Sequence, residues 1–237
     1  LSNYFQKKNY KIISSYRKTF PKNLKNKKGI SIKKVDLEKK INIKKNFDIL
    51  IHCASAIPDY KLSDKKIDKV NVLGFKKLLE NCERYNCKKI ILISTMDVYG
   101  KININKIDEN YIGKNIKSYG KSKKFMEKML EKFCKKNKID GFVLRLPGVI
   151  GKNSKHNFLS NTLNKLIRGE NLEISNPKLK FNNLIHVKNL CSLIEKTFRK
   201  QGFYVFNVAS RYPMYLISII KFLRKNLNNK KSRIIIL

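Results

Sequence analysis

The sequence is poor in acidic residues and has no long apolar run. It contains 17 Asp and Glu against 54 Lys and Arg, which gives a formal net charge of +37. No apolar stretch approaches the roughly 18 residues that a membrane span requires, and no signal-peptide pattern is visible. The apolar segment Met214–Leu223 is too short for a span, so we expect a core helix there. These absences predict a protein without a membrane partner.

The spacing of the cysteines does not indicate a disulfide framework. Cys82 and Cys87 have no second pair at a spacing typical of zinc sites, so no metal is expected. Cys53 falls in an apolar, strand-like run. We expect free, buried thiols in a reducing cytoplasm. The five cysteines are Cys53, Cys82, Cys87, Cys134 and Cys191.

The excess of basic residues has two explanations. Such a charge balance is typical of proteins that bind nucleic acids or anionic surfaces. Here, however, the lysines are spread evenly along the chain among many asparagines and form no single stripe. We therefore favour a biased surface composition over specific nucleic-acid binding. A modest attraction for polyanions follows in either case.

Apolar runs and helical patterns alternate along the chain. Strands separated by helices of this length predict βαβ crossovers and a parallel sheet. The expected strands of this sheet are Tyr10–Ser14, Ile30–Lys33, Phe47–His52, Lys89–Ser94, Gly141–Leu146 and Phe203–Val208. The chain is expected to begin with the end of a helix, near Gln6. Further helices are expected over residues 72–82, 119–133, 158–168 and 188–198. After Gly151 the regular alternation of long strands and helices ends. Short strands are expected there at Leu172–Ile174, Phe181–Val187 and Ser232–Leu237.

Polar residues at strand ends point to a site. In open parallel sheets, ligands bind beyond the carboxyl ends of the strands. Thr95 follows one buried strand, and Tyr119 and Lys123 lie four residues apart on one face of the next helix. A neighbouring ammonium favours the phenolate and would lower the pKa of Tyr119, which suits proton transfer. The ordinary alternatives are a capping threonine, a half-buried tyrosine and a surface lysine.

Seven segments, in order, carry a resemblance to one protein family. They resemble extended short-chain dehydrogenase/reductases of the NAD(P)-dependent epimerase/dehydratase group over about residues 1–210. The segments are Asp48–Ala56, Asn71–Glu80, Ser94–Gly100, Tyr119–Lys123, Arg145–Gly151, Leu184–Leu190 and Phe206–Val208.

The resemblance implies roles for individual residues. Tyr119 is the implied general acid/base, Lys123 holds the nicotinamide ribose, and Thr95 orients the reacting oxygen. The implied catalytic residues are thus Thr95, Tyr119 and Lys123. The implied cofactor-binding residues are Arg17, Asp36, Ala54, Ser55, Ala56, Tyr119, Lys123 and Pro147. The expected cofactor is NAD or NADP and the expected substrate is a nucleotide sugar; a homodimer is compatible with the family.

Four departures from the family pattern qualify these roles. The glycine-rich Gly-x-x-Gly-x-x-Gly loop is absent, since the first glycine is Gly29, and we interpret the chain as truncated at both ends. Arg17 stands near the position where an NAD-specific member has an acid, which leaves NADP open. Asn182 replaces an arginine that many sugar-nucleotide enzymes carry. Met96 cannot transfer a proton, so we rank dehydration below reduction or epimerisation.

The sequence thus predicts an α/β protein with a doubly wound, Rossmann-like parallel sheet. Residues 1–150 would form the NAD(P)-binding domain without its first strand and loop, with sheet elements also from about 181–210. Residues 151–180 and 211–237 would form a small, incomplete substrate lobe. We expect NAD(P)-dependent reduction or epimerisation of a nucleotide-linked sugar, with little activity from these 237 residues alone. The main alternative is a catalytically inactive dinucleotide-binding module.

Overall fold

The computed structural model describes all residues except 42, 44, 58–61, 103, 105, 153, 155, 156, 229 and 230. The chain divides into two compact units, which we describe one at a time. The first consists of Leu1–Leu146 and Cys191–Asn207, and the second of Pro147–Leu190 and Val208–Leu237. No helix among the described residues is long and apolar enough to cross a membrane.

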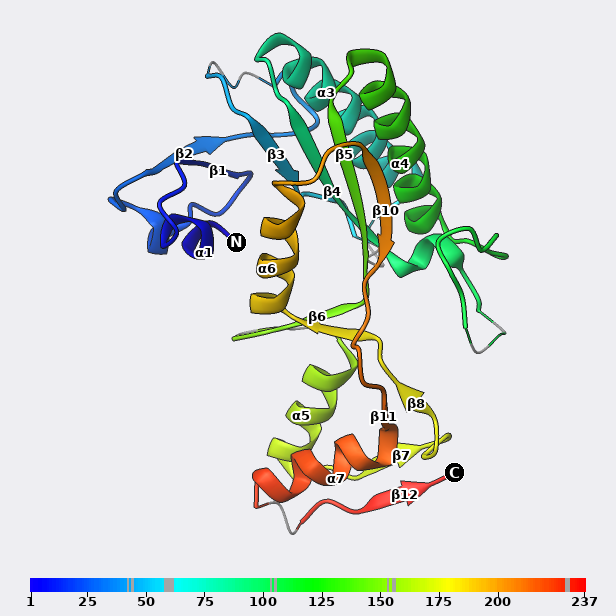
Figure 1. Ribbon diagram of the computed structural model, residues 1–237. Coiled ribbons are helices and arrows are strands. Elements are labelled where there is room, and N and C mark those ends of the chain that lie inside the picture. Colours follow the sequence, from blue (N-terminus) through cyan, green and yellow to red (C-terminus); the bar gives the residue numbers. More distant parts are fainter. Residues whose placement is uncertain are drawn as a thin grey trace. The chain divides into compact units, whose positions relative to one another are not determined.

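The first unit is built on a four-stranded parallel sheet (Figure 1). The strands lie in the order β10-β5-β4-β3, and each pair of neighbours is parallel. Their bounds are β3 (Ile49–His52), β4 (Lys89–Thr95), β5 (Asp140–Leu146) and β10 (Phe203–Asn207). This arrangement confirms the predicted α/β class.

Helices cover both faces of this sheet, as the long apolar runs of β4 and β5 require. Figure 1 shows α3 (Gly74–Arg84) and α4 (Ser118–Asn137) on one face and α6 (Val187–Thr197) on the other. Phe75, Met126 and Val143 are fully buried in the core between the sheet and the first two helices. Two short helical segments, α2 (Asp64–Asp68) and a π-helical turn (Lys69–Leu73), lead directly into α3. A 3-10 turn (Met96–Tyr99) follows β4.

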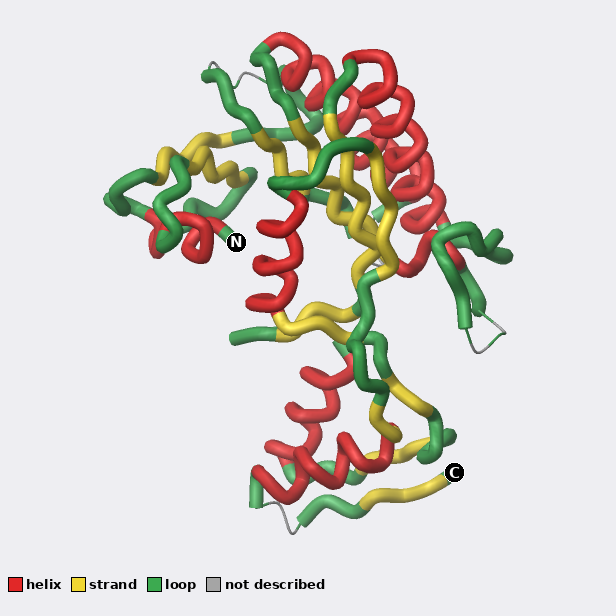
Figure 2. The backbone as a smooth tube through the Cα atoms, in the orientation of Figure 1, coloured by secondary structure: helices red, strands yellow, loops and turns green. Residues whose placement is uncertain are grey.

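The first two strands form a separate parallel pair. These are β1 (Ile12–Tyr16) and β2 (Ile30–Lys34), preceded by α1 (Ser2–Gln6) and linked through a 3-10 turn (Lys22–Leu24). Among the described residues, neither strand is paired with the four-stranded sheet (Figure 2). The single sheet that the alternating pattern suggests is therefore interrupted between β1 and β3.

Among the residues that the structure describes, the second unit holds three small two-stranded sheets and two complete helices. Leu166, Leu172, Ile174 and Ile220 form its own buried cluster. The pairs are β6 (Gly148–Ile150) with β9 (Leu184–His186), β7 (Leu172–Ile174) with β12 (Ile234–Ile236), and β8 (Lys180–Phe181) with β11 (Met214–Tyr215). The helices are α5 (Phe158–Arg168) and α7 (Leu216–Asn226).

Three expectations differ from the structure. The run Phe181–Val187 holds two short strands that pair within the second unit, so of the region 181–210 only β10 joins the main sheet. The helix expected at Met214–Leu223 starts at Leu216. Four cysteines are buried, but Cys53 lies beyond the end of β3 and is exposed.

Candidate active site

The predicted catalytic residues lie where α4 begins against the end of β4. Lys123 is 2 % exposed, and its Nζ donates to the Ile93 carbonyl at 2.9 Å, two residues before Thr95. Gly120 is needed at the start of α4, because a Cβ there would lie 2.2 Å from the Asp97 carbonyl oxygen. The first turn of α4 therefore rests directly on the turn that follows Thr95.

Thr95 has a structural task in this arrangement. Its hydroxyl accepts a hydrogen bond from the Asp97 amide at 3.2 Å and caps the Met96–Tyr99 turn. This is the ordinary role that the sequence left open for Thr95. The residue is only half-buried, so its side chain also borders the solvent-accessible end of β4.

Burial governs the protonation of both Tyr119 and Lys123. Desolvation lowers the pKa of Lys123 to about 8. Desolvation also raises the pKa of Tyr119, opposed by a hydrogen bond with Ser55 and reinforced by the Asp97 carboxylate. The Lys123 Nζ lies 6.0 Å from the centre of the Tyr119 ring. In the protein alone, therefore, the tyrosine is not acidified, and the predicted lowering by Lys123 stays a prediction for the ligand-bound site.

Asn71 joins the loop after β3 to α4. It is fully buried in the π-helical turn, and its Oδ1 accepts from the Ala56 amide at 2.7 Å and from the Ser55 hydroxyl at 3.0 Å. Its Nδ2 donates to the Ala56 carbonyl and to the Ser122 hydroxyl, which in turn donates to the Tyr119 carbonyl. Asn71 begins one of the family segments, but no role was predicted for it. An amide between two apolar residues on a helix is the signal that points to it, since buried polar groups need partners.

A buried ion pair lies behind the site. Arg145 and Glu127 form three side-chain hydrogen bonds at 2.7–3.2 Å, and Glu127 also accepts from the Ser94 hydroxyl at 2.5 Å. Arg145 further donates to the Tyr99 hydroxyl at 2.5 Å. The network ties α4 to β4 and β5 next to Thr95. Arg145 was included in a family segment, but Glu127 and Ser94 were not assigned roles.

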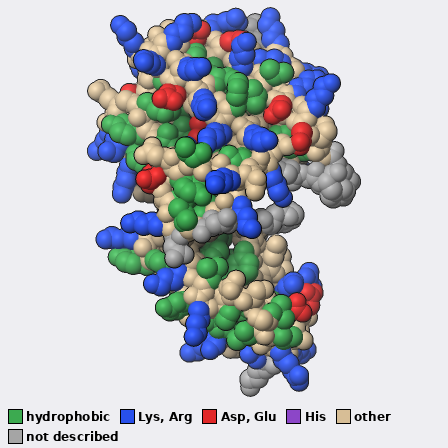
Figure 3. All heavy atoms as spheres, turned by 90° about the vertical axis from the view of Figure 1, so that its right-hand side faces the viewer, with side chains coloured by type: hydrophobic (Ala, Val, Ile, Leu, Met, Phe, Trp, Pro, Cys, Tyr) green, Lys and Arg blue, Asp and Glu red, His purple; other side chains and the backbone are tan. Residues whose placement is uncertain are grey.

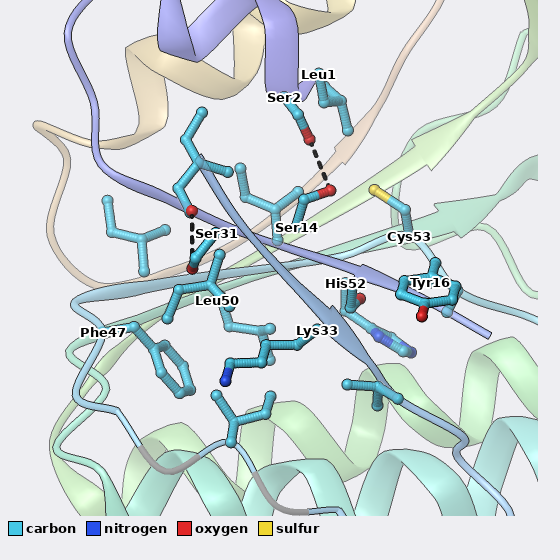
Figure 4. A pocket seen from close by; sticks show the side chains of 18 of the residues that line it. Leu1, Ser2, Ser14, Tyr16, Ser31, Lys33, Phe47, Leu50, His52 and Cys53 are labelled. Carbon is cyan, nitrogen blue, oxygen red and sulfur yellow. Dashed lines mark hydrogen bonds between the residues drawn. The ribbon is translucent and has the colours of Figure 1, made fainter. Parts of the chain in front are cut away.

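Five of the predicted cofactor-binding residues line one cavity of the first unit. The cavity has a volume of about 1480 Å³ and is bordered by β1 and β3 (Figure 4). These five residues are Arg17, Asp36, Ala54, Ser55 and Ala56. Tyr119 borders a smaller cavity of about 310 Å³, together with Ile67 and Ser118. Pro147 directly follows β5 and belongs to the second unit.

Arg17 is already paired with acids. Its NH2 group lies 2.5 Å from the Glu38 carboxylate and its Nε lies 3.4 Å from Asp36. Lys66 makes a second contact with Glu38 at 2.5 Å. The pKa of Asp36 is lowered, first by the backbone hydrogen bond from Glu38 and then by Arg17. A phosphate bound here would have to compete with these carboxylates for Arg17.

The cavity suits part of a dinucleotide. Small residues at the end of β3 leave room for a ribose, and Arg17 and Asp36 offer polar contacts at the ends of β1 and β2. A pyrophosphate normally binds at a glycine-rich turn before a helix N-terminus. Among the described residues, the lining of this cavity contains a single glycine, Gly29, which lies just before β2. The residues present therefore fit the nucleoside ends of a dinucleotide better than its pyrophosphate.

The charged side chains on the face shown in Figure 3 form no concentrated site. Figure 3 shows Lys and Arg side chains scattered over the face it presents, with Asp and Glu among them. No group of three His, Cys, Asp or Glu side chains that could hold a metal occurs in the described part of the chain.

A known family matches most of this chain. The model of the "NAD dependent epimerase/dehydratase family" covers residues 1–209. A dTDP-D-glucose 4,6-dehydratase from Dictyostelium discoideum is 25% identical over 193 residues, which are 75% of this chain and 44% of the relative. The chain spans about half the length of the curated relatives it matches, between 44% and 52%.

Solved structures share the fold. A UDP-N-acetylglucosamine 4-epimerase from Bacillus cereus has a TM-score of 0.81 at 18% identity, covering 99% of this chain and 79% of that one. A dTDP-glucose 4,6-dehydratase from Bacillus anthracis, solved in complex with NAD, has a TM-score of 0.78 at 17% identity, with 100% and 79% covered. These likenesses confirm the Rossmann-like α/β fold.

Proposed function

The chain belongs to the NAD-dependent epimerase/dehydratase family, and from this membership we propose that it serves NAD(P)-dependent reduction or epimerisation of a nucleotide-linked sugar. The solved relatives above are named for UDP- and dTDP-sugars, which supports a nucleotide sugar as the substrate class. Met96 follows Thr95 and has no proton to transfer, so dehydration ranks below these two reactions.

The observation that carries the proposal is the position of Tyr119 and Lys123. Both lie on the first turns of α4, against the carboxyl end of β4, and Asn71 connects them to the loop after β3. Ligands of open parallel sheets bind at such strand ends. A phenol and an ammonium at this edge are suited to moving a proton to or from a sugar oxygen.

In the proposed mechanism each residue has one task. Tyr119 donates or accepts the proton at the sugar oxygen, and Thr95 holds that oxygen by a hydrogen bond. Lys123, whose ammonium contacts the Ile93 carbonyl in the protein alone, would hold the ribose of the cofactor and would favour the phenolate of Tyr119. The bound nicotinamide supplies the hydride chemistry. Arg17, Asp36, Ala54, Ser55 and Ala56 would hold the cofactor.

A second candidate is a catalytically inactive dinucleotide-binding module. It is favoured by the raised pKa of Tyr119 and by the contact of Lys123 with the strand instead of with the phenol. This candidate predicts that the chain binds NAD or NADP but turns over no nucleotide sugar.

The substitution Tyr119→Phe tests the proposal. It removes the proton-transferring hydroxyl, and general acid–base catalysis contributes about 10²–10⁴-fold. We expect turnover of UDP-glucose, UDP-N-acetylglucosamine or dTDP-glucose to fall at least about 100-fold, while the Kd for NAD measured by fluorescence changes less than about threefold.

The exposed Tyr204 in β10 provides a matched control. Tyr204→Phe should leave both turnover and cofactor affinity unchanged. Full turnover by Tyr119→Phe would exclude Tyr119 as the acid/base. NAD binding by the unmodified chain without turnover of any of the three sugars would support the inactive module instead.

A further inference from the structure

One helix of the first unit carries an ordered row of basic side chains. Although the charged side chains are scattered over the surface and not concentrated at one point, α4 brings five lysines onto one side. At 3.6 residues per turn, their spacing of three or four residues places them within an arc of about 80° and over a length of about 21 Å. Four of them are exposed, and Lys124 is partly exposed. The lysine row consists of Lys121, Lys124, Lys128, Lys132 and Lys135.

The lysine row has no acidic side chain within its arc. α4 contains two acids, Glu127 and Glu131. Glu127 is buried and paired with Arg145, and Glu131 lies on the flank of the row, about 60° from its centre. Lys136, on the other flank, reaches Glu83 at 3.9 Å. Among the described residues, the five lysines of the row form no ion pair.

Neighbouring lysines of the row repel one another. Residues three or four apart are neighbours on a helix, with Cβ atoms about 5–6 Å apart, and like charges at this spacing disfavour the helix. The row contains four such neighbouring pairs. The exposed Glu131 offsets the repulsion only towards the C-terminal end of the row. A polyanion that lies along the row would relieve the repulsion over its whole length.

An exposed aromatic ring lies beside the lysine row. Phe125 is 55% exposed and lies one helical turn from both Lys121 and Lys128. Among the described residues, it is the one large apolar side chain of α4 that is exposed, whereas Met126 and Leu130 are fully buried. A nucleic-acid base can stack on such a ring while the phosphates on either side of that base contact lysines.

These features favour a single-stranded nucleic acid over other anionic partners. A helix that binds a membrane surface inserts its apolar face into the lipid, but the apolar face of α4 packs in the main core. The core of a protein–protein interface is depleted of charged residues, whereas five lysines occupy the centre of this surface. The phosphates of a duplex wind around its axis and away from a straight row. A flexible single strand can follow the row and leaves its bases free to stack.

We propose that the lysine row of α4 and Phe125 form a binding surface for single-stranded nucleic acid, which contacts the phosphate backbone and a stacked base without reading the base sequence. Lysine contacts with phosphates release counterions, which drives binding and makes it depend on salt. The row and Phe125 do not include Tyr119 or the buried Lys123. The proposal therefore does not depend on catalysis.

Two charge-matched variants of the full 237-residue chain separate the lysine row from the overall charge. The row variant carries three changes, Lys128→Gln, Lys132→Gln and Lys135→Gln. The control variant carries three changes at exposed lysines of α5 and α7, Lys165→Gln, Lys221→Gln and Lys225→Gln. Glutamine is as good a helix former as lysine, and both variants have the same net charge. Fluorescence anisotropy with a labelled oligothymidylate of about 20 nucleotides gives the Kd at each NaCl concentration.

The row variant should lose far more affinity than the control variant. At 0.1 M NaCl we expect the row variant to bind at least about tenfold more weakly than the unmodified chain, and the control variant to stay within about threefold of it. For a single strand, the logarithm of the affinity falls with the logarithm of the salt concentration by about 0.7 per phosphate contact, so the row variant should reduce this slope by about 2. Equal losses in the two variants would overturn the proposal, because overall charge would then explain the binding. Failure of the unmodified chain to bind the oligothymidylate would also overturn it.

The substitution Phe125→Ala tests the stacked base. We expect it to weaken oligothymidylate binding about fivefold or more and to leave the binding of inorganic polyphosphate, which has no bases, unchanged. Phe222→Ala removes an exposed ring of α7 and should change neither affinity. Unchanged oligothymidylate binding by Phe125→Ala, or an equal loss for polyphosphate, would refute the base contact. Tighter binding of a duplex, or of vesicles that contain phosphatidylserine, than of the single strand would overturn the proposal in favour of that partner.

Discussion

At the scale of single residues, Lys123 stands out as a charged side chain that is almost completely buried. An ammonium that is 2 % exposed has lost nearly all of its water, and among the described residues it donates a hydrogen bond to one acceptor, the Ile93 carbonyl. Glu127 and Cys53 favour the charged form, but desolvation outweighs them. A lysine poised near pH 8 can change its charge when a ligand arrives, which suits a residue that assists a tyrosine.

This burial makes stability depend on pH. The pKa of Lys123 is about 8 in the folded protein and 10.5 in the unfolded chain, so the unfolded chain binds more protons between these values. The free energy of unfolding should therefore rise through this window, by about 3 kcal/mol in total. Lys123→Met has a similar length and no charge, and it should remove this rise.

The measurement is urea unfolding of both proteins from pH 7 to pH 10. The difference between the two curves isolates Lys123 from the other lysines, which titrate equally in both. Parallel curves would mean that Lys123 keeps a normal pKa in the folded protein. An NMR titration of the Lys123 side chain, with an expected midpoint near pH 8, gives an independent value.

At the scale of elements, α4 is fixed to the sheet by the Arg145–Glu127 pair. Both side chains are at most 9% exposed, and Ser94 of β4 completes the contact. A buried ion pair adds little net stability compared with apolar residues, but removing one partner leaves an uncompensated charge. The pair therefore matters more for where α4 sits than for how stable the unit is.

Glu127→Gln should accordingly lower the free energy of unfolding by about 3 kcal/mol or more. The double change Glu127→Leu with Arg145→Met should cost less than Glu127→Gln alone, because no charge is left buried. The exposed pair of Lys88 and Asp48 is the control, and Asp48→Asn should cost less than about 1 kcal/mol. A double change that costs as much as Glu127→Gln alone, or more, in denaturant unfolding would refute the coupling.

Sequence patterns located most elements, because their boundaries are set locally. The helix Phe158–Arg168 agrees with the expected range of about 158–168: Asn157 caps its start, and Gly169, at φ 75°, ends it. β1 begins two residues later than expected, because Tyr10 packs against the rings of Phe5 and Phe198 instead of extending the strand.

Local sequence patterns could not predict contacts between residues that lie far apart in the chain. Asn71 and Ser122 are 51 residues apart, and Arg17 and Glu38 are 21 apart, so no local period brings either pair together. The four-residue spacing and the family resemblance both pointed to Tyr119 and Lys123, but neither showed that Lys123 contacts the strand. Nor did alternation alone reveal the gap between β1 and β3, which depends on strand order.

At the scale of the whole molecule, the dominant feature is uncompensated charge. Even if every acidic side chain formed an ion pair, a net charge of +37 would remain. Figure 3 shows the Lys and Arg side chains dispersed over the visible face, with fewer Asp and Glu side chains among them. Net charge far from zero destabilises a compact state through self-repulsion, and salt screens that repulsion.

Added salt should therefore stabilise this protein. The Debye length falls from about 30 Å at 0.01 M to about 10 Å at 0.1 M, so most of the relief should come at low ionic strength. We expect the urea midpoint at pH 7 to rise between 0.01 M and 0.2 M NaCl and then to level off. Sodium sulfate also strengthens apolar burial and should continue to stabilise beyond that point. A midpoint that falls with NaCl would show that local ion pairs, such as Arg17 with Glu38, outweigh the overall repulsion.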